Sequence, residues 1–148
     1  MQLFGKCLVA VADGEHARLF EERRRGGALT ERSAWVEDLR PGGHIAAHPK
    51  GRVFQRVGPG SHTGEATPPH DRAEARFLQS LARRIDELVS SEGFDEIILI
   101  APPRALGVLR EALAAPSRKR LAASEAALRC NETPAALRTT IRQLRNAA

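Results

Sequence analysis

The sequence predicts an α/β fold in which three helices cover a mixed sheet of about five strands, an antiparallel meander followed by parallel strands. Three observations predict it. Asp13-Gly14 lies between two β-compatible runs, which is the strongest short-range hairpin signal. Residues 77–89 carry apolar side chains at helical spacing. Residues 97–101 form an unbroken apolar run, the pattern of a central parallel strand covered on both faces.

The antiparallel part occupies the first third of the chain. Lys6–Ala12 is a short apolar run, and residues 17–22 continue on the other side of the Asp-Gly turn. A second turn at Gly26-Gly27 leads into Ala28–Val36, a β-compatible stretch that contains Trp35. These segments predict a three-stranded meander.

Residues 39–70 form a long loop rich in glycine, proline and histidine, in which Val53–Val57 is the one candidate for a short strand. A loop of this length inside a compact domain is usually functional or disordered. Its four histidines are expected to be solvated rather than to hold a metal ion, because Gly42-Gly43 and Pro49 disfavour the helix that would place His44 and His48 on one face. The candidate functional residues of the loop are Gly58, Gly60, Ser61, His62 and Gly64.

The first helix follows this loop. Asp71-x-x-Glu74 is interpreted as a capping box after two prolines, and the apolar periodicity continues until Gly93. A second helix is marked by leucines at 106, 109 and 113 and ends before Pro116.

The chain is expected to end with a strand and a helix. Residues 120–128 are a candidate strand, although many alanines weaken the pattern. Thr133 with Pro134 begins the last helix, which carries Leu137, Ile141 and Leu144 on one face. This order of elements is compatible with the ribonuclease-H-like architecture and its relatives in the translation machinery. The length of 148 residues predicts a single domain over residues 1–148.

The charge of the chain is concentrated near its end. The formal net charge is +5, and residues 101–148 alone contain nine Arg and Lys against three Glu, a net charge of +6. This segregation indicates a face that approaches an anionic partner such as RNA, although an Arg-rich solvated surface would give the same count. The candidate anion-binding residues are Arg118, Lys119 and Arg120, together with Arg104, where a helix N-terminus follows the central strand. Sparse aromatic residues argue against base stacking.

Catalytic chemistry is not expected. A two-metal nuclease needs converging carboxylates, but Asp13 is explained by its turn and Glu74 by the helix cap. Cys7 lies within an apolar run. Arg129 and Asn131 flank Cys130 and favour a more reactive thiol, but nothing else marks it as a nucleophile. The sequence has no P-loop, so no cofactor is expected. The N-terminal apolar run is too short for a signal peptide or a membrane span, which predicts a cytoplasmic protein.

Three strings carry a family resemblance: Val11–Gly14 with Ala17–Phe20, then Gly51–Phe54, then Phe94–Gly107. With them the chain resembles the bacterial host attachment protein family along nearly its whole length. That family is similar in turn to the central domain of archaeal and eukaryotic peptide-chain release factors. In those factors a Gly-Gly-Gln loop between the antiparallel strands and the long helix reaches the peptidyl-transferase centre, and residues 58–70 occupy the comparable place. The sequence contains no Gly-Gly-Gln.

The resemblance and the charge segregation together predict a non-catalytic, release-factor-like domain that docks on the ribosome or on structured RNA. Two alternatives remain open at this point. The family name favours an adhesion-related regulatory protein that acts through protein contacts. The loop histidines would instead suit a hydrolase.

Overall fold

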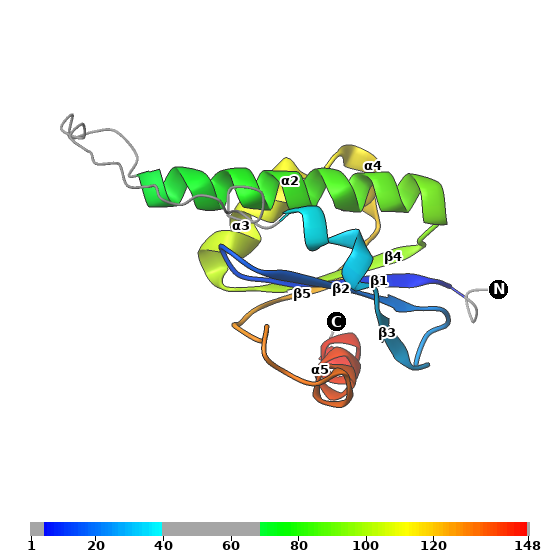
Figure 1. The fold of residues 1–148 in the computed structure, drawn as a ribbon. Helices are drawn as coiled ribbons and strands as arrows, with labels where there is room; N and C mark the ends of the chain where they lie inside the picture. The colour runs from blue at the N-terminus through cyan, green and yellow to red at the C-terminus, as the bar shows by residue number, and fades with distance from the viewer. Residues whose placement is uncertain (1–4, 40–68, 148) are drawn as a thin grey trace.

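The computed structural model describes residues 5–39 and 69–147. It contains a five-stranded mixed sheet in the order β3-β2-β1-β4-β5, which confirms the predicted fold class (Figure 1). Strands β1 and β2 pair antiparallel, as do β2 and β3, whereas β4 lies parallel to both β1 and β5. The strands are β1 Cys7–Ala12, β2 Ala17–Glu22, β3 Leu29–Glu31, β4 Glu96–Ala101 and β5 Leu121–Ala126. The α-helices are α2 Pro69–Glu92, α3 Pro103–Ala112, α4 Ala115–Lys119 and α5 Pro134–Ala147.

The Asp-Gly turn makes the first hairpin, as predicted. The Asp13 carboxylate accepts hydrogen bonds from the backbone N–H groups of Glu15 and His16, both at 2.7 Å. An aspartate that caps its own turn in this way fixes the chain reversal between β1 and β2. The hairpin therefore rests on local chemistry that the sequence displays.

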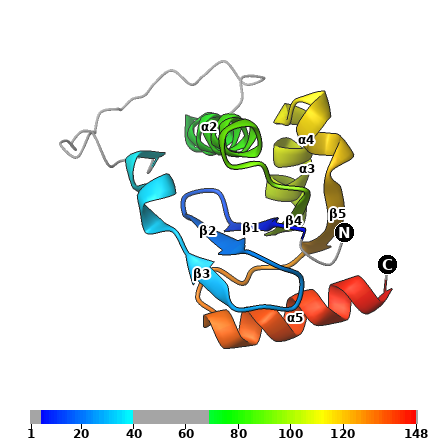
Figure 2. The same ribbon diagram turned by 90° about the vertical axis from the view of Figure 1, so that its right-hand side faces the viewer.

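The two central strands are buried on both faces, which explains their continuous apolar sequences. Helices α2, α3 and α4 lie on one face of the sheet and α5 lies on the other (Figure 2). Alternate side chains of β1 and β4 enter two separate core clusters, one beneath α2 and α3 and one beneath α5. The predicted apolar face of the first helix is confirmed, since all of its members are buried: Phe77, Leu78, Leu81, Ile85, Leu88 and Val89.

The last helix begins as the sequence predicts. The Thr133 hydroxyl accepts a hydrogen bond from the backbone N–H of Ala136 at 3.1 Å, and Pro134 occupies the first helical position. Leu137 and Ile141 are buried against the sheet, and Leu144 packs at the margin of the same cluster. Helix α5 thus closes the second face.

The predicted β stretch Ala28–Val36 is wrong over most of its length. Strand β3 covers only Leu29–Glu31, and the chain then forms two short 3-10 helices at Ser33–Trp35 and Glu37–Leu39. The Trp35 ring meets the Phe94 ring edge-on with centroids 5.9 Å apart. The Arg84 guanidinium of α2 donates to the Trp35 carbonyl and to the Asp38 carboxylate. These contacts with residues distant in the sequence hold the segment after β3 outside the sheet.

Two predictions about the helices also need correction. Helix α2 begins at Pro69, so Asp71 lies inside its first turn rather than at a capping position, and its carboxylate pairs with Arg104 instead. Helix α4 was not predicted. It is held by Asp86 of α2, whose carboxylate accepts from the Ser117 hydroxyl at 2.5 Å and from the Ala114 N–H at 3.2 Å. A five-residue helix fixed by a tertiary contact has no periodicity to detect.

Gly93 ends α2 with φ +72°, a left-handed conformation in which a Cβ atom would meet nothing within 4 Å. Gly93→Ala is therefore expected to cost about 1 kcal/mol of unfolding free energy through backbone conformation alone. Gly107→Ala is the matched control, because Gly107 is helical and equally uncrowded, and should stabilise by about 0.5 kcal/mol. Urea unfolding of both variants tests whether the two substitutions change the unfolding free energy in opposite directions. Equal changes in unfolding free energy at the two positions would contradict the left-handed conformation of Gly93.

Candidate anion-binding site

The carboxyl ends of β1, β4 and β5 meet at one edge of the sheet, here called the carboxyl edge. Ligands of open α/β sheets often bind at such an edge, and the sequence predicts Arg104 as an anion-binding residue there. The structure places Arg104 in a pocket of about 270 Å³ between the Asp-Gly turn and the starts of α2 and α3. Its guanidinium forms an ion pair with Asp71 at 2.9 Å. Asp71 and Glu74 both line this pocket, so acidic side chains outnumber the arginine.

The turn and the long helix touch at this edge. A Cβ atom on Gly14 would lie 2.5 Å from the Glu74 carboxyl carbon, so any other residue at this position would require the end of the Glu74 side chain to move. The carboxylates of Asp13 and Glu74 are therefore on neighbouring elements, as a two-metal site would require. Asp13, however, is engaged in its turn. Within residues 5–39 and 69–147, no group of three or more His, Cys, Asp or Glu could hold a metal ion.

A second pocket of about 490 Å³ opens on the other side of the turn, between Asp13 and the loop that joins β5 to α5. Arg18 anchors that loop, since its guanidinium donates to the carbonyls of Cys130 at 2.8 Å and Glu132 at 2.7 Å. The same guanidinium binds the Glu31 carboxylate in a bidentate pair. Arg18 thus has a structural role at this pocket.

Neither cysteine is activated as a nucleophile. Burial, together with the nearby Glu22 carboxylate, raises the pKa of the Cys7 thiol to about 12. Burial, together with Asp13, raises the pKa of Cys130 to about 11. Because the thiolate is the reactive species, both side chains are protonated and inert near neutral pH.

The predicted basic run lies at the opposite edge of the sheet, here called the amino edge, where β4 and β5 begin. The structure therefore does not bring Arg118, Lys119 and Arg120 together with Arg104. The Arg120 guanidinium donates to the carbonyls of Phe94 at 3.1 Å and Pro116 at 2.8 Å, which ties α4 to the sheet. Arg118 reaches the carbonyl of Glu111 at 3.4 Å and remains exposed, as does Lys119.

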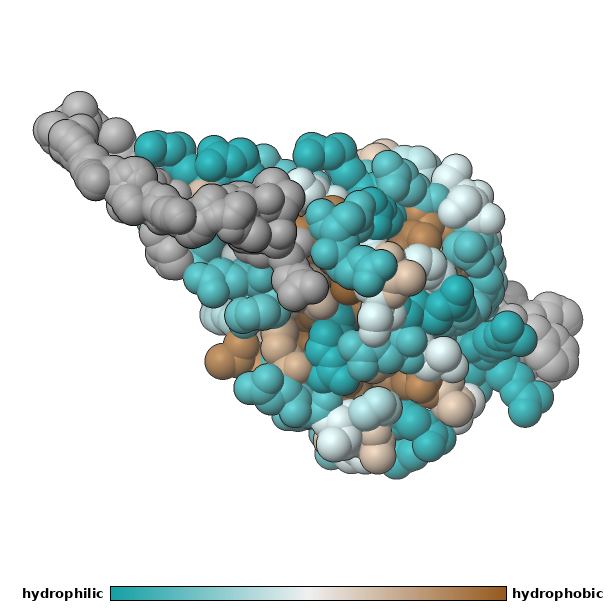
Figure 3. Space-filling model, viewed as in Figure 1, coloured by the Kyte–Doolittle hydropathy of each residue, from teal (hydrophilic) through white to brown (hydrophobic). Residues whose placement is uncertain are grey.

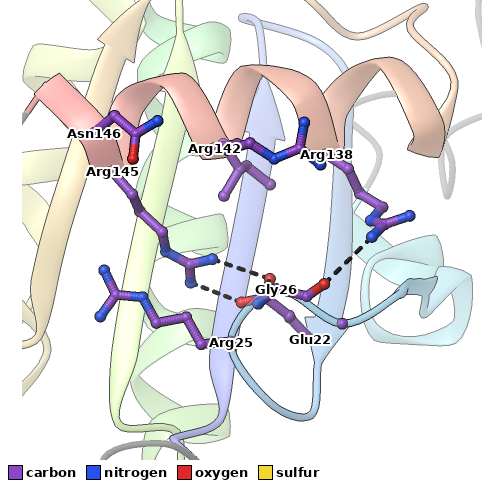
Figure 4. A pocket seen from close by; sticks show the side chains of 9 residues that line it. Glu22, Arg25, Gly26, Arg138, Arg142, Arg145 and Asn146 are labelled. Carbon is purple, nitrogen blue, oxygen red and sulfur yellow. Dashed lines mark hydrogen bonds and ion pairs between the residues drawn. The ribbon is translucent and has the colours of Figure 1, made fainter.

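Sequence reasoning missed a second group of arginines at the amino edge. We call it the arginine pocket: a cavity of about 250 Å³ between α5 and the turn that joins β2 to β3 (Figure 4). The spacing of three arginines on one face of the last helix, four and three residues apart, was the available signal. Its arginines are Arg25, Arg138, Arg142 and Arg145, and its acidic residue is Glu22.

Arg145 and Glu22 form the floor of the arginine pocket. Their side chains are 10% and 3% exposed, and the guanidinium contacts the two carboxylate oxygens at 2.7 and 3.0 Å. Arg145 also contacts Glu96 at 3.2 Å. These bonds, first of all those to Glu22, raise the pKa of Arg145 above its ordinary value. Among the described residues, the buried Nε–H of Arg145 finds no hydrogen-bond acceptor.

The loop candidates Gly58, Gly60, Ser61, His62 and Gly64 lie outside the described residues, as does the predicted strand Val53–Val57. Their assignment stays a prediction.

In the described ranges, no helix combines the length and the apolar character needed to cross a membrane.

The fold and its charged edges define a small mixed α/β domain that presents arginine-rich surface at one end of its sheet. The chain belongs to the family described as protein required for attachment to host cells, whose sequence model matches residues 8–141. A comparison with curated proteins gave no match. The family assignment confirms the resemblance drawn from the sequence strings, whereas the likeness to release factors stays a prediction.

Proposed function

We propose that this member of the host attachment family is a cytoplasmic, non-catalytic domain that docks on structured RNA, such as that of the ribosome, through its amino edge. The family description names a process, attachment to host cells, and the proposal names a molecular contact. The observation that carries it is the gathering of exposed cations at one edge of the sheet. Six of them come from three separate elements: Arg23, Arg24, Arg25, Arg118, Lys119 and Arg142.

The sheet register supports this placement. Glu22 at the end of β2 pairs with Cys7, Cys7 pairs with Glu96, and β5 begins opposite Ile97. The turn after β2 and helix α4 before β5 therefore lie at the same edge. The most buried acids of this edge are consumed by internal ion pairs, since Glu21 binds Arg32 and Glu22 binds Arg145. The exposed acids Glu92 and Asp95 also lie at this edge, where the six exposed cations outnumber them.

The rest of the described surface favours a polar contact over an apolar one. Figure 3 shows the viewed face as largely hydrophilic, with apolar residues scattered between polar ones. The carboxyl edge, with Asp71 and Glu74 around Arg104, would repel a polyanion. We therefore place the contact on Arg118 and Lys119 and treat Arg104 as peripheral to it.

Salt dependence tests the proposal. If all six cations contact phosphates, RNA affinity should fall by about 10³-fold between 50 and 200 mM salt, because each neutralised phosphate releases counterions. The first measurement is co-sedimentation of the chain with ribosomes at low and high salt. Affinity for a structured RNA is then measured by fluorescence anisotropy. Binding that does not change with salt would refute the proposal.

A pair of charge reversals locates the contact. Arg118→Glu with Lys119→Glu should weaken RNA binding and reduce the slope of log affinity against log salt by about 2, one unit for each lost phosphate contact. Arg76→Glu with Arg83→Glu is the matched control, because it makes the same charge change at exposed positions on α2. If the control variant bound RNA as weakly as the α4 variant, the effect would reflect net charge and α4 would not be the contact.

A further inference from the structure

We infer that the arginine pocket binds one phosphate group of the RNA, so that a single backbone or terminal phosphate is held between α5 and the β2–β3 turn. The inference rests on the proposed function for the source of the phosphate. It goes beyond that function because it assigns a defined subsite to residues outside the predicted basic run.

The charges that line the pocket favour a multiply charged anion. Four arginines face one acid, and that acid, Glu22, is already engaged by Arg145. Arg25 is half exposed and has only a longer contact of 3.7 Å, to Glu96. Arg142 makes no hydrogen bond or ion pair with any other described residue. Arg25 and Arg142 therefore keep N–H groups available for a ligand, and each guanidinium carries five donors.

The pocket is also preorganised. Arg145 is fixed by the carboxylates of Glu22 and Glu96, and the Arg138 guanidinium donates to the Gly26 carbonyl at 3.2 Å. The Gly26 N–H in turn donates to Glu22 at 3.1 Å. Figure 4 shows how these bonds connect the turn to two successive parts of α5. Because Arg138 and Arg145 are held in place before a ligand arrives, the conformational entropy lost on binding would come mainly from Arg25 and Arg142.

The size and lining of the pocket exclude recognition of a base. Its volume of about 250 Å³ is below the range of about 300–1,000 Å³ typical of pockets for drug-sized ligands. No aromatic side chain is among the described residues that line it, so a base would find no stacking surface. Guanidinium groups bind phosphate oxygens in bidentate fashion. The pocket would thus contact the RNA backbone without discriminating between base sequences.

Titrations followed by NMR test this inference. Inorganic phosphate replaces chloride at constant ionic strength, and the backbone amides of Gly26, Gly27 and α5 are followed. These amides should shift in a saturable way in the unmodified protein. In Arg25→Gln with Arg142→Gln the apparent affinity should fall at least about tenfold, because two charged donors are lost. Arg83→Gln, an exposed arginine on the opposite face of the sheet, should titrate like the unmodified protein.

A parallel titration with a short RNA hairpin separates this inference from the proposed function. Shifts of the same pocket amides by phosphate and by RNA support both. RNA that binds without moving the pocket amides refutes the subsite and leaves the proposed function standing. Phosphate shifts in the pocket without any RNA binding refute the proposed function, and with it RNA as the source of the phosphate. A double variant that titrates like the unmodified protein overturns the pocket itself.

Discussion

Arg145→Met is expected to destabilise the protein by about 3 kcal/mol, because it removes one partner of a buried ion pair. The Glu22 carboxylate is only 3% exposed and would keep a single described donor, the N–H of Gly26. A buried carboxylate without its cation retains its full desolvation cost. The midpoint of urea unfolding, followed by the fluorescence of Trp35, measures the loss.

Two further variants separate the ion pair from the packing of the Arg145 side chain. Arg142→Met lies one turn earlier on α5 at an exposed position and should change stability by no more than about 0.5 kcal/mol. Glu22→Gln keeps an acceptor for Gly26 while removing the charge. The double variant Glu22→Gln with Arg145→Met should cost less than the sum of the single variants, by a coupling energy of about 1–3 kcal/mol. Additive effects would mean that the two side chains do not stabilise each other.

The ion pair between Glu22 and Arg145 could not be predicted from the sequence. Glu22 ends a strand beside three arginines, and such a charge is ordinarily a solvated one. Its partner lies 123 residues further along the chain. Local patterns carry no information about which distant charge a strand end will meet. The arginine pocket was missed for this reason, although each of its halves is visible in the sequence.

The predictions that held depend on local chemistry. The Asp13 turn, the apolar run of β4 and the Thr133 cap each act within a few residues. The predictions that failed were overruled by long-range contacts. Trp35 leaves the sheet to meet Phe94, and α4 exists because Asp86 of α2 binds its first turn. Arg104 and Arg118 were both predicted to bind anions, for different reasons, and the sheet topology places them at opposite edges.

Phe94→Ala is expected to lower the unfolding free energy by about 3 to 5 kcal/mol, the usual cost of deleting a buried aromatic side chain. Phe94 is 1% exposed, meets the Trp35 ring edge-on and lies beneath the Lys6 ammonium at 4.9 Å. The cavity would therefore open beneath α2, beside the amino edge to which the RNA contact is assigned.

Phe94→Leu is the control for this substitution, because it preserves most of the side-chain volume and should cost about 1 kcal/mol. The chain has one tryptophan and no tyrosine, so its fluorescence reports directly on the face that Phe94 covers. Native Trp35 emission should shift to the red in the alanine variant, as water reaches the ring, and change little in the leucine variant. Equal costs for the two substitutions would show that the Trp35–Phe94 contact does not anchor the segment after β3. In that case the bonds from Arg84 to Trp35 and Asp38 would have to hold it.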